Sequence, residues 1–328
     1  MPLLSTLLHL TNFRNPFLRT LIPSIGLAFG LQAAAGIPSI AFQTERFYDL
    51  SGSLTYISCT ALSLYLPTLR ARLAAQAAGG SLPPWPSLLS AFASKGGSIG
   101  WNWRQVALSA AVTIWAARLG SFLFSRITSD SGRDSRFDSI RGSPPKFLGA
   151  FFAQATWVSL CLLPVLAVNS LPATSLALLP ALTATDLIGV LLYVGGITFE
   201  ATADRQKSRW VQEKKEKKHD EDFLTRGLWS KSRHPNYFGE ATLWTGIATV
   251  AAGVMVSAKG QAAMGLAGGP AGKIAALAMA GVSPAFVTFL LFFVSGIPLS
   301  EKKYDKKYGD RKDYQEWKKN TPVFIPKF

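Results

Sequence analysis

The sequence predicts an all-α membrane protein, a bundle of about seven transmembrane helices with short interfacial helices on its cytosolic side. Of its 328 residues, 48% are hydrophobic and only 16% are charged, whereas soluble domains carry about 25% charged residues. The apolar residues gather in runs long enough to cross a bilayer, which takes about 20 helical residues. Lysines and arginines gather between those runs, as they do in integral membrane proteins.

Seven apolar stretches qualify as spans of the lipid bilayer. They cover residues 21–42, 52–69, 103–124, 148–168, 187–203, 237–257 and 277–299. The second and fifth are short, and the last contains Pro284, which a membrane helix tolerates with a kink. Gly246 and Gly253 in the sixth stretch are seven residues apart and therefore share one helix face. Small residues on one face favour a role in helix packing.

The connections between the stretches predict the orientation. Residues 125–145, residues 204–235 and the tail after Ser300 are rich in lysine and arginine, whereas residues 169–186 contain neither. The positive-inside rule therefore puts these basic connections and the C-terminus in the cytosol, and the N-terminus on the other side. Arg70, Arg72 and Lys95, in the loop predicted outside, run against this assignment but are outnumbered.

Two function classes are not expected. The net charge of +15 does not indicate nucleic-acid binding, because the basic residues lie between apolar spans and form no basic face with interleaved aromatic residues. A metal site is not expected either, because the three histidines are scattered and Cys59 and Cys161 lie alone in apolar runs. Residues 267–274 are similar to a phosphate loop, but Ala267 and Ile274 stand where glycine and Ser or Thr are needed.

The densest polar segment at the mouth of an apolar span is Ser-Arg-His-Pro-Asn-Tyr-Phe-Gly-Glu at residues 232–240. Such a cluster is costly to bury unless its groups pair with each other or with a ligand. Pro235 suits the first turn of a helix. The free N–H groups and positive dipole end of that helix would then face the same side as Arg233 and His234, which favours anion binding. We interpret the segment as a site for a phosphorylated cofactor; a polar helix cap with snorkelling side chains is the alternative.

Two further segments on the same predicted side carry candidate ligands. Glu200, Asp204 and Lys207 share a helix face at the end of the fifth span, where an interfacial ion pair is the alternative. In the tail, Arg311 and Tyr314 lie among other aromatic residues and lysines. Aromatic rings there would stack on a nicotinamide or adenine ring while basic groups hold phosphates. An interfacial helix with an aromatic belt is the alternative.

Five short motifs follow one another in a fixed order: Asp-Arg-Gln-Lys at 204–207, Gly-Leu-Trp at 227–229, the segment 232–240, Gly-Ile-Pro-Leu-Ser-Glu at 296–301 and Thr-Pro-Val-Phe-Ile-Pro at 321–326. Together with Arg-Asp-Ser-Arg-Phe at 133–137 and Gln-Ala-Thr-Trp at 154–157, they resemble a family of membrane proteins of unknown function. That family is similar to the C-terminal domain of steroid 5-alpha-reductases. The chain is therefore divided into an N-terminal membrane region, residues 1–102, with two spans, and a steroid-5-alpha-reductase-like catalytic membrane domain, residues 103–328.

The resemblance implies a reductase that uses NADPH to reduce an activated C=C bond in a hydrophobic small molecule, a steroid, sterol or enoyl lipid. Tyr237 and Glu240 would lie near the nicotinamide and are the candidate catalytic residues. The residues implied to bind the cofactor are Asp204, Arg205, Lys207, Arg233, His234, Asn236, Arg311 and Tyr314. The same resemblance implies the endoplasmic reticulum, with the N-terminus lumenal. The carbonyl-polarising Glu and Tyr of steroid reductases have no match, although Glu45, Tyr56 and Tyr65 are available.

Two other functions stay open. Isoprenylcysteine and phospholipid methyltransferases also carry Arg-His-Pro-x-Tyr followed by a glycine and an acidic residue, and bind S-adenosylmethionine there. The motifs at 204–207 and 296–301 favour the reductase. The third possibility is a lipid-binding membrane protein that keeps the fold without catalysis.

Overall fold

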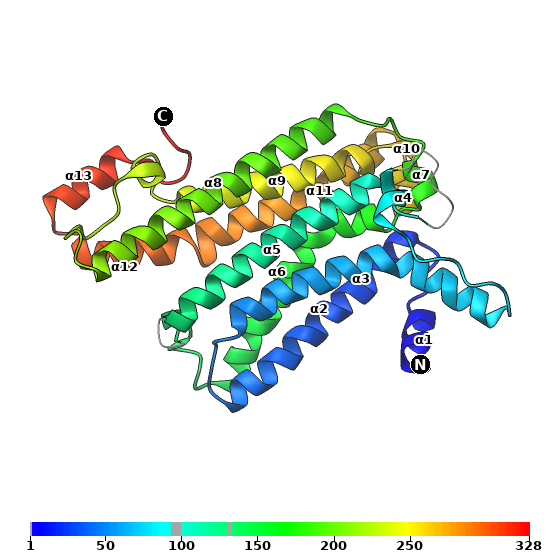
Figure 1. Cartoon of the computed structure of the whole chain (residues 1–328), viewed down its shortest axis with the longest axis horizontal. Coiled ribbons are helices and arrows are strands. Elements are labelled where there is room, and N and C mark those ends of the chain that lie inside the picture. Colours follow the sequence, from blue (N-terminus) through cyan, green and yellow to red (C-terminus); the bar gives the residue numbers. More distant parts are fainter. Residues whose placement is uncertain (1, 93–99, 130–132) are drawn as a thin grey trace. The chain divides into compact units, whose positions relative to one another are not determined.

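The computed structural model describes residues 2–92, 100–129 and 133–328, and every regular element in these ranges is a helix (Figure 1). This confirms the predicted all-α class. The α-helices are α1 (Pro2–Leu10), α2 (Pro16–Ala41), α3 (Tyr48–Ala77), α4 (Leu88–Phe92), α5 (Trp103–Ser129), α6 (Pro144–Asn169), α7 (Ala173–Leu176), α8 (Ala184–Lys215), α9 (Pro235–Met255), α10 (Ala258–Met264), α11 (Gly269–Phe289), α12 (Ile297–Tyr308) and α13 (Lys312–Asn320). Two 3₁₀ turns, η1 (Ser135–Phe137) and η2 (Gly227–Ser230), and a π-helical segment, η3 (Leu290–Val294), complete the described elements.

Within the described residues, five helical segments are long and apolar enough to cross a membrane: α2, α5, α6, α8 and the run Gly269–Tyr308. A sixth is added if α9 and α10, bent by 93° at a short break, form one broken span. Six of the seven predicted stretches fall largely on one helix each, and the last runs through α11, η3 and the start of α12, so the predicted number is close. The predicted stretch 52–69 lies on α3, which is not apolar enough to count as a span. This helix is rich in serine and threonine and buries Ser53, Thr55 and Ser63 among others.

The chain divides into two compact units. Unit 1 comprises Met1–Asp186 and Ala248–Ser283, and unit 2 comprises Leu187–Ile247 and Pro284–Phe328. Each is described by itself below. The domain boundary predicted at residue 102 stays a prediction.

Unit 1 is built on α2, α3, α5 and α6, which lie side by side (Figure 1). A buried polar chain joins three of these helices. Gln154 on α6 donates to Gln32 on α2 over 3.0 Å and to the Tyr48 carbonyl over 2.9 Å, and Gln32 donates to Thr55 on α3 over 2.8 Å. Buried amides need such partners. The first residue of the motif at 154–157, Gln154, therefore has a structural role: it hydrogen-bonds α6 to α2 and to the start of α3.

Glu45, between α2 and α3, is 1% exposed and is bound on both oxygens. Arg141 donates to them over 2.6 and 2.9 Å, and the Asp134 backbone N–H donates over 2.7 Å. Burial opposes ionisation of Glu45, but these hydrogen bonds outweigh it and lower its pKa. The Glu45 carboxylate therefore binds the loop that contains the motif at 133–137.

Unit 2 is organised around α8 and the start of α9, whose backbones touch at glycines. A Cβ added to Gly196 would lie 2.5 Å from the Leu243 amide nitrogen, and one added to Gly246 would lie 2.5 Å from that of Tyr193. This close approach confirms the packing role predicted for Gly246. Within unit 1, Gly253 faces the side chain of Thr185, and a Cβ there would clash with its Oγ1. With 32 residues α8 is about 48 Å long. It therefore exceeds the roughly 30 Å hydrocarbon core, and its charged end extends beyond it.

Candidate functional site

The first two motifs form one joint in unit 2, after the apolar part of α8. The Leu228 N–H donates to Gln206 Oε1 over 2.8 Å, and Trp229 Nε1 donates to the Ala203 carbonyl over 3.0 Å. Lys207 Nζ lies 4.8 Å from the centre of the Trp229 ring. Gly227 has φ of +63°, a backbone conformation that favours glycine, and a Cβ there would also displace the Gln206 amide, whose Oε1 lies 2.6 Å away.

The third and fifth motifs lie against each other. The Arg233 N–H donates to the Pro322 carbonyl over 2.8 Å. Ser232 Oγ donates to the Phe324 carbonyl over 2.9 Å and accepts from the His234 N–H over 3.1 Å. The end of the chain is thereby fixed beside the start of α9, which begins at Pro235 as the sequence predicts.

The fourth motif delivers a carboxylate to the same place. The π-helical segment η3 follows α11, and a Cβ on Gly296 would lie 2.5 Å from the Leu291 carbonyl oxygen, so the break needs glycine. Pro298 then stands in the first turn of α12, where its missing N–H costs nothing. Glu301 on this helix lies 3.0 Å from His234 Nε2 and 3.4 Å from Arg233 Nη1.

We call the group of Arg233, His234, Tyr237, Glu301 and Lys318 the His234 cluster. Lys318 Nζ lies 3.2 Å from Glu301, and the ring of Tyr237 lies parallel to that of His234, with centroids 5.3 Å apart. Arg233 is 8% and His234 4% exposed. Charged groups buried to this extent are found paired, and here one carboxylate serves three nitrogen-bearing side chains.

Two polar atoms beside this pairing stay unsatisfied. Asn236 Oδ1 and Arg233 Nε are both buried, and neither has a hydrogen-bond partner among the described residues. Native proteins leave few buried polar atoms without a partner, and those that are left point to an ion, a water or a ligand. The site therefore has both an acceptor and a donor available for a bound molecule.

The other predicted ligands are placed as follows. Tyr314 is buried and joins the cluster indirectly, because its hydroxyl donates to Asp305 over 2.9 Å and Asp305 in turn lies 2.5 Å from Lys318. Lys207 is exposed but close enough to contribute to the field at His234. Asp204 is buried and Arg205 exposed, both on α8, and Glu240 lies one turn after Tyr237 on α9.

Arg311 is bound elsewhere. It lies 2.5 Å from Asp222 and 2.6 Å from Asp313, and its hydrogen bond, with that from Lys214, lowers the pKa of Asp222. Two carboxylates thus compensate its charge, and it holds the tail to the loop after α8. The contributions of Arg311 and of the other candidates to cofactor binding stay predictions.

The sequence reasoning missed three residues that complete the cluster. Glu301 lies in a motif that was recognised, but no role was given to it. Lys318 is one of nine basic residues in the tail, and nothing local distinguishes it from the others. Asp305 links Lys318 to Tyr314.

The fold and the cluster define an integral membrane protein with a buried histidine–carboxylate site at the polar end of its helices. The chain belongs to the family described as a protein of unknown function (DUF1295), whose model matches residues 77–321. This confirms the family that the motifs indicated. The match contains the first four motifs and ends at Thr321, where the fifth begins. No curated protein and no solved structure matches the chain.

Acidic pH is expected to destabilise unit 2 through His234. Burial lowers the pKa of His234 from its ordinary 6.5, against the opposing effect of the hydrogen bond to Glu301. The unfolded chain then takes up a proton near pH 6.5 and the folded chain only at lower pH. The free energy of unfolding therefore has its highest value above pH 6.5. It falls as the pH drops from 6.5 toward the lowered pKa of His234, by at most about 1.4 kcal/mol per pH unit.

The measurement is the unfolding temperature of the detergent-solubilised protein between pH 5 and 7.5. The matched control is His234→Gln, which keeps a donor for Glu301 but cannot titrate, and its curve should be flatter. Identical curves for both proteins would contradict the assignment.

Proposed function

We propose that this protein is an NADPH-dependent membrane reductase that acts on an activated C=C bond in a steroid, sterol or enoyl lipid. One observation supports this most: motifs up to about 90 residues apart meet around Arg233 and His234, where Asn236 Oδ1 and Arg233 Nε have no hydrogen-bond partner in the described part of the chain. A constellation built from distant segments with open hydrogen-bonding capacity is typical of a binding site.

The residues present suit a phosphorylated dinucleotide. The site carries three positive side chains, those of Lys207, Arg233 and Lys318. Only two carboxylates, those of Glu301 and Asp305, pair with Arg233 and Lys318, so a net positive charge remains. Arginine binds phosphate oxygens through its planar fork of donors. The Asn236 amide offers a donor and an acceptor, which matches a carboxamide or a purine edge. Two cavities of about 1320 and 470 Å³ lie in unit 1 and are lined by none of these residues.

NADPH held there would supply the hydride. The chain's own residues would bind and orient it: Arg233 and Lys318 at phosphates and Asn236 at an amide edge. Glu301 fixes the His234 ring from one side and the Tyr237 ring lies parallel to it, so the Tyr237 side chain is pre-positioned. Its hydroxyl would hold the proton for the substrate's enolate oxygen, with Glu240 one turn further along α9.

The proposed location is the endoplasmic reticulum membrane, with the N-terminus lumenal and the C-terminus cytosolic. The cluster includes Lys318 from the basic tail. By the positive-inside rule it would therefore face the cytosol.

The test is ligand binding by the detergent-solubilised full chain. We expect NADPH to raise the unfolding temperature and S-adenosylmethionine to leave it unchanged, because a ligand stabilises by RT ln(1 + [L]/Kd). Asn236→Ala should raise the Kd for NADPH at least about tenfold, since it removes one hydrogen-bonding group worth about 1.4 kcal/mol or more. Without ligand it should leave stability unchanged, because Oδ1 makes no protein hydrogen bond.

Lys215→Ala, at an exposed lysine at the end of α8, is the matched control and should bind NADPH like the wild type. Stabilisation by S-adenosylmethionine alone would favour the methyltransferase. Binding of NADPH with no turnover across enones and enoyl lipids would favour the non-catalytic alternative. An unchanged Kd in Asn236→Ala would remove the site assignment.

A further inference from the structure

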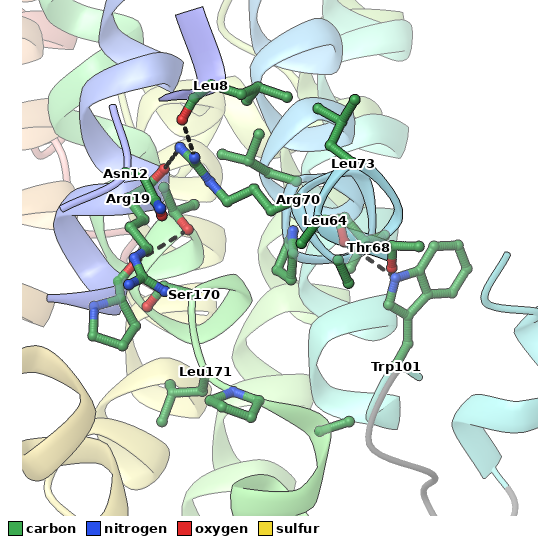
Figure 2. Close-up of a pocket in the computed structure, with 18 of the residues that line it drawn as sticks. Leu8, Asn12, Arg19, Leu64, Thr68, Arg70, Leu73, Trp101, Ser170 and Leu171 are labelled. Carbon is green, nitrogen blue, oxygen red and sulfur yellow. Dashed lines mark hydrogen bonds between the residues drawn. The ribbon is translucent and has the colours of Figure 1, made fainter. Parts of the chain in front are cut away.

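A cavity of about 1320 Å³ lies in unit 1, at the end of the bundle where α2 and α5 begin and α3 and α6 end (Figure 2). Pockets that take drug-sized molecules measure roughly 300–1000 Å³, so this one has room for a larger ligand. It is formed by α1 and the start of α2 with the segment between them, the second half of α3, the start of α5 and the residues that follow α6.

The charge of this cavity is one-sided. Arg19 and Arg70 line it, and no aspartate or glutamate does among the residues that the structure describes. Figure 2 shows Arg70 extending from α3 toward Leu8. Its guanidinium donates to backbone carbonyls, over 3.0 Å to Thr11 and 3.1 Å to Arg19. Its Nε is buried without a partner, and among the described residues neither arginine forms an ion pair.

Arg104 shows the contrast within the same unit. It is also buried, but it forms a salt bridge of 2.6 Å with Asp186. The two arginines that line the cavity, by contrast, have no carboxylate partner among the described residues. A role in this cavity would also explain why Arg70 lies at an end of the bundle where the positive-inside rule predicts few basic residues.

The rest of the lining is largely apolar. Trp101 is 6% exposed and donates its indole N–H to the Leu64 carbonyl over 3.2 Å, which fixes the ring against α3 (Figure 2). Leu66, Leu73 and Leu171 add further apolar surface. A free inorganic anion gains nothing from such surface, whereas an acyl chain is stabilised by each methylene group that it buries there.

We propose that this cavity binds a single-chain amphiphile with an anionic head, such as a long-chain carboxylate. The head lies at Arg19 and Arg70, and the chain lies along Leu73, Trp101 and Leu171. The proposal is independent of the reductase activity, because it uses none of the residues of the His234 cluster.

The test uses the full chain in a non-ionic detergent and 9,10-dibromostearic acid as the probe, since bromine quenches tryptophan fluorescence at short range. We expect saturable quenching, with binding at least tenfold weaker for the uncharged methyl ester. Arg19→Gln should also weaken binding of the acid at least tenfold. Trp101→Phe should remove most of the saturable quenching and so locate the chain.

Arg72→Gln is the matched control, because Arg72 is on the same helix, donates to the Pro83 carbonyl and does not line the cavity. It should bind the acid like the wild type. Arg70→Gln is a weaker test, since Arg70 also holds carbonyls near α1. Equal affinity for acid and ester, wild-type binding by Arg19→Gln, saturable quenching retained in Trp101→Phe, or displacement of the acid by millimolar inorganic phosphate would each overturn the proposal. NADPH binding is unaffected in every case, so the two proposals fail separately.

Discussion

Replacing Gly196 with alanine is expected to lower the free energy of unfolding by about 3 kcal/mol, the upper part of the range for overpacking. The added Cβ would lie 2.5 Å from the Leu243 amide nitrogen and 2.7 Å from the Gly239 carbonyl oxygen. Both are main-chain atoms of α9, so no side chain can rotate out of the way. The two helices must separate, and the contacts around Gly239 and Gly246 are lost with them.

Gly195 is the matched control. It precedes Gly196 on α8, but a Cβ there meets no atom within 4 Å. Gly195→Ala should therefore be neutral or stabilise by up to about 1 kcal/mol, the difference in helix propensity. Thermal unfolding in detergent, with the yield of monodisperse protein, measures both variants. Equal losses in the two would show that α8 and α9 are not in backbone contact at Gly196.

The helices could be predicted because the relevant signals are local. A run of about 20 apolar residues is visible in the sequence alone, and so is a proline that suits a first turn, as at Pro235. Residues 52–69 lie on a helix as predicted, but α3 is not among the helical segments apolar enough to cross a membrane. The reason is its content of serine and threonine, since its buried side carries hydroxyl groups such as those of Ser53 and Ser63.

The continuation of α8 beyond its apolar part could be predicted only in part. The predicted span ends at residue 203, and the spacing of Glu200, Asp204 and Lys207 already places them on one helix face, but the helix continues to Lys215. No apolar period marks the end of the helix among the charged residues that follow. The helix is what brings Gln206 and Lys207 to the joint with Trp229.

The site could be predicted in its parts but not in its pairing. The segment 232–240 stands out because ionisable groups are rare next to apolar spans. Its partners do not, since Glu301 and Lys318 are 67 and 84 residues from His234 and become neighbours only through the turn at Gly296 and the docking of residues 322–324 on Ser232 and Arg233. Sequence spacing within one helix says nothing about such contacts. Among the polar residues of this segment, Asn236 and Arg233 are therefore the best candidates to bind a ligand, because Asn236 Oδ1 and Arg233 Nε have no hydrogen-bond partner among the described residues.

Removing one partner of the buried ion pair in unit 1 is expected to have a comparably large effect. Arg104 is 2% and Asp186 1% exposed, and Arg104 donates to both carboxylate oxygens, over 2.9 and 2.6 Å. Arg104→Met would leave a buried carboxylate with Thr183 as its remaining partner. Breaking a buried pair on one side costs about 3–5 kcal/mol, because the other charge stays buried without compensation.

The double variant Arg104→Met/Asp186→Asn separates that cost from lost packing. In the wild type the Thr183 N–H donates to Asp186 Oδ2 over 2.8 Å, a hydrogen bond that caps the start of α8. Asparagine keeps an acceptor for this N–H but carries no charge. The double variant should therefore regain at least half of the stability lost in Arg104→Met, measured by chemical unfolding in detergent as a double-mutant cycle. The control is Arg209→Ala, at an exposed pair with Glu213 where the loss should be too small to measure, because solvent screens the pair. If the double variant is no more stable than Arg104→Met, the loss comes from packing around Arg104 and not from the unpaired charge of Asp186.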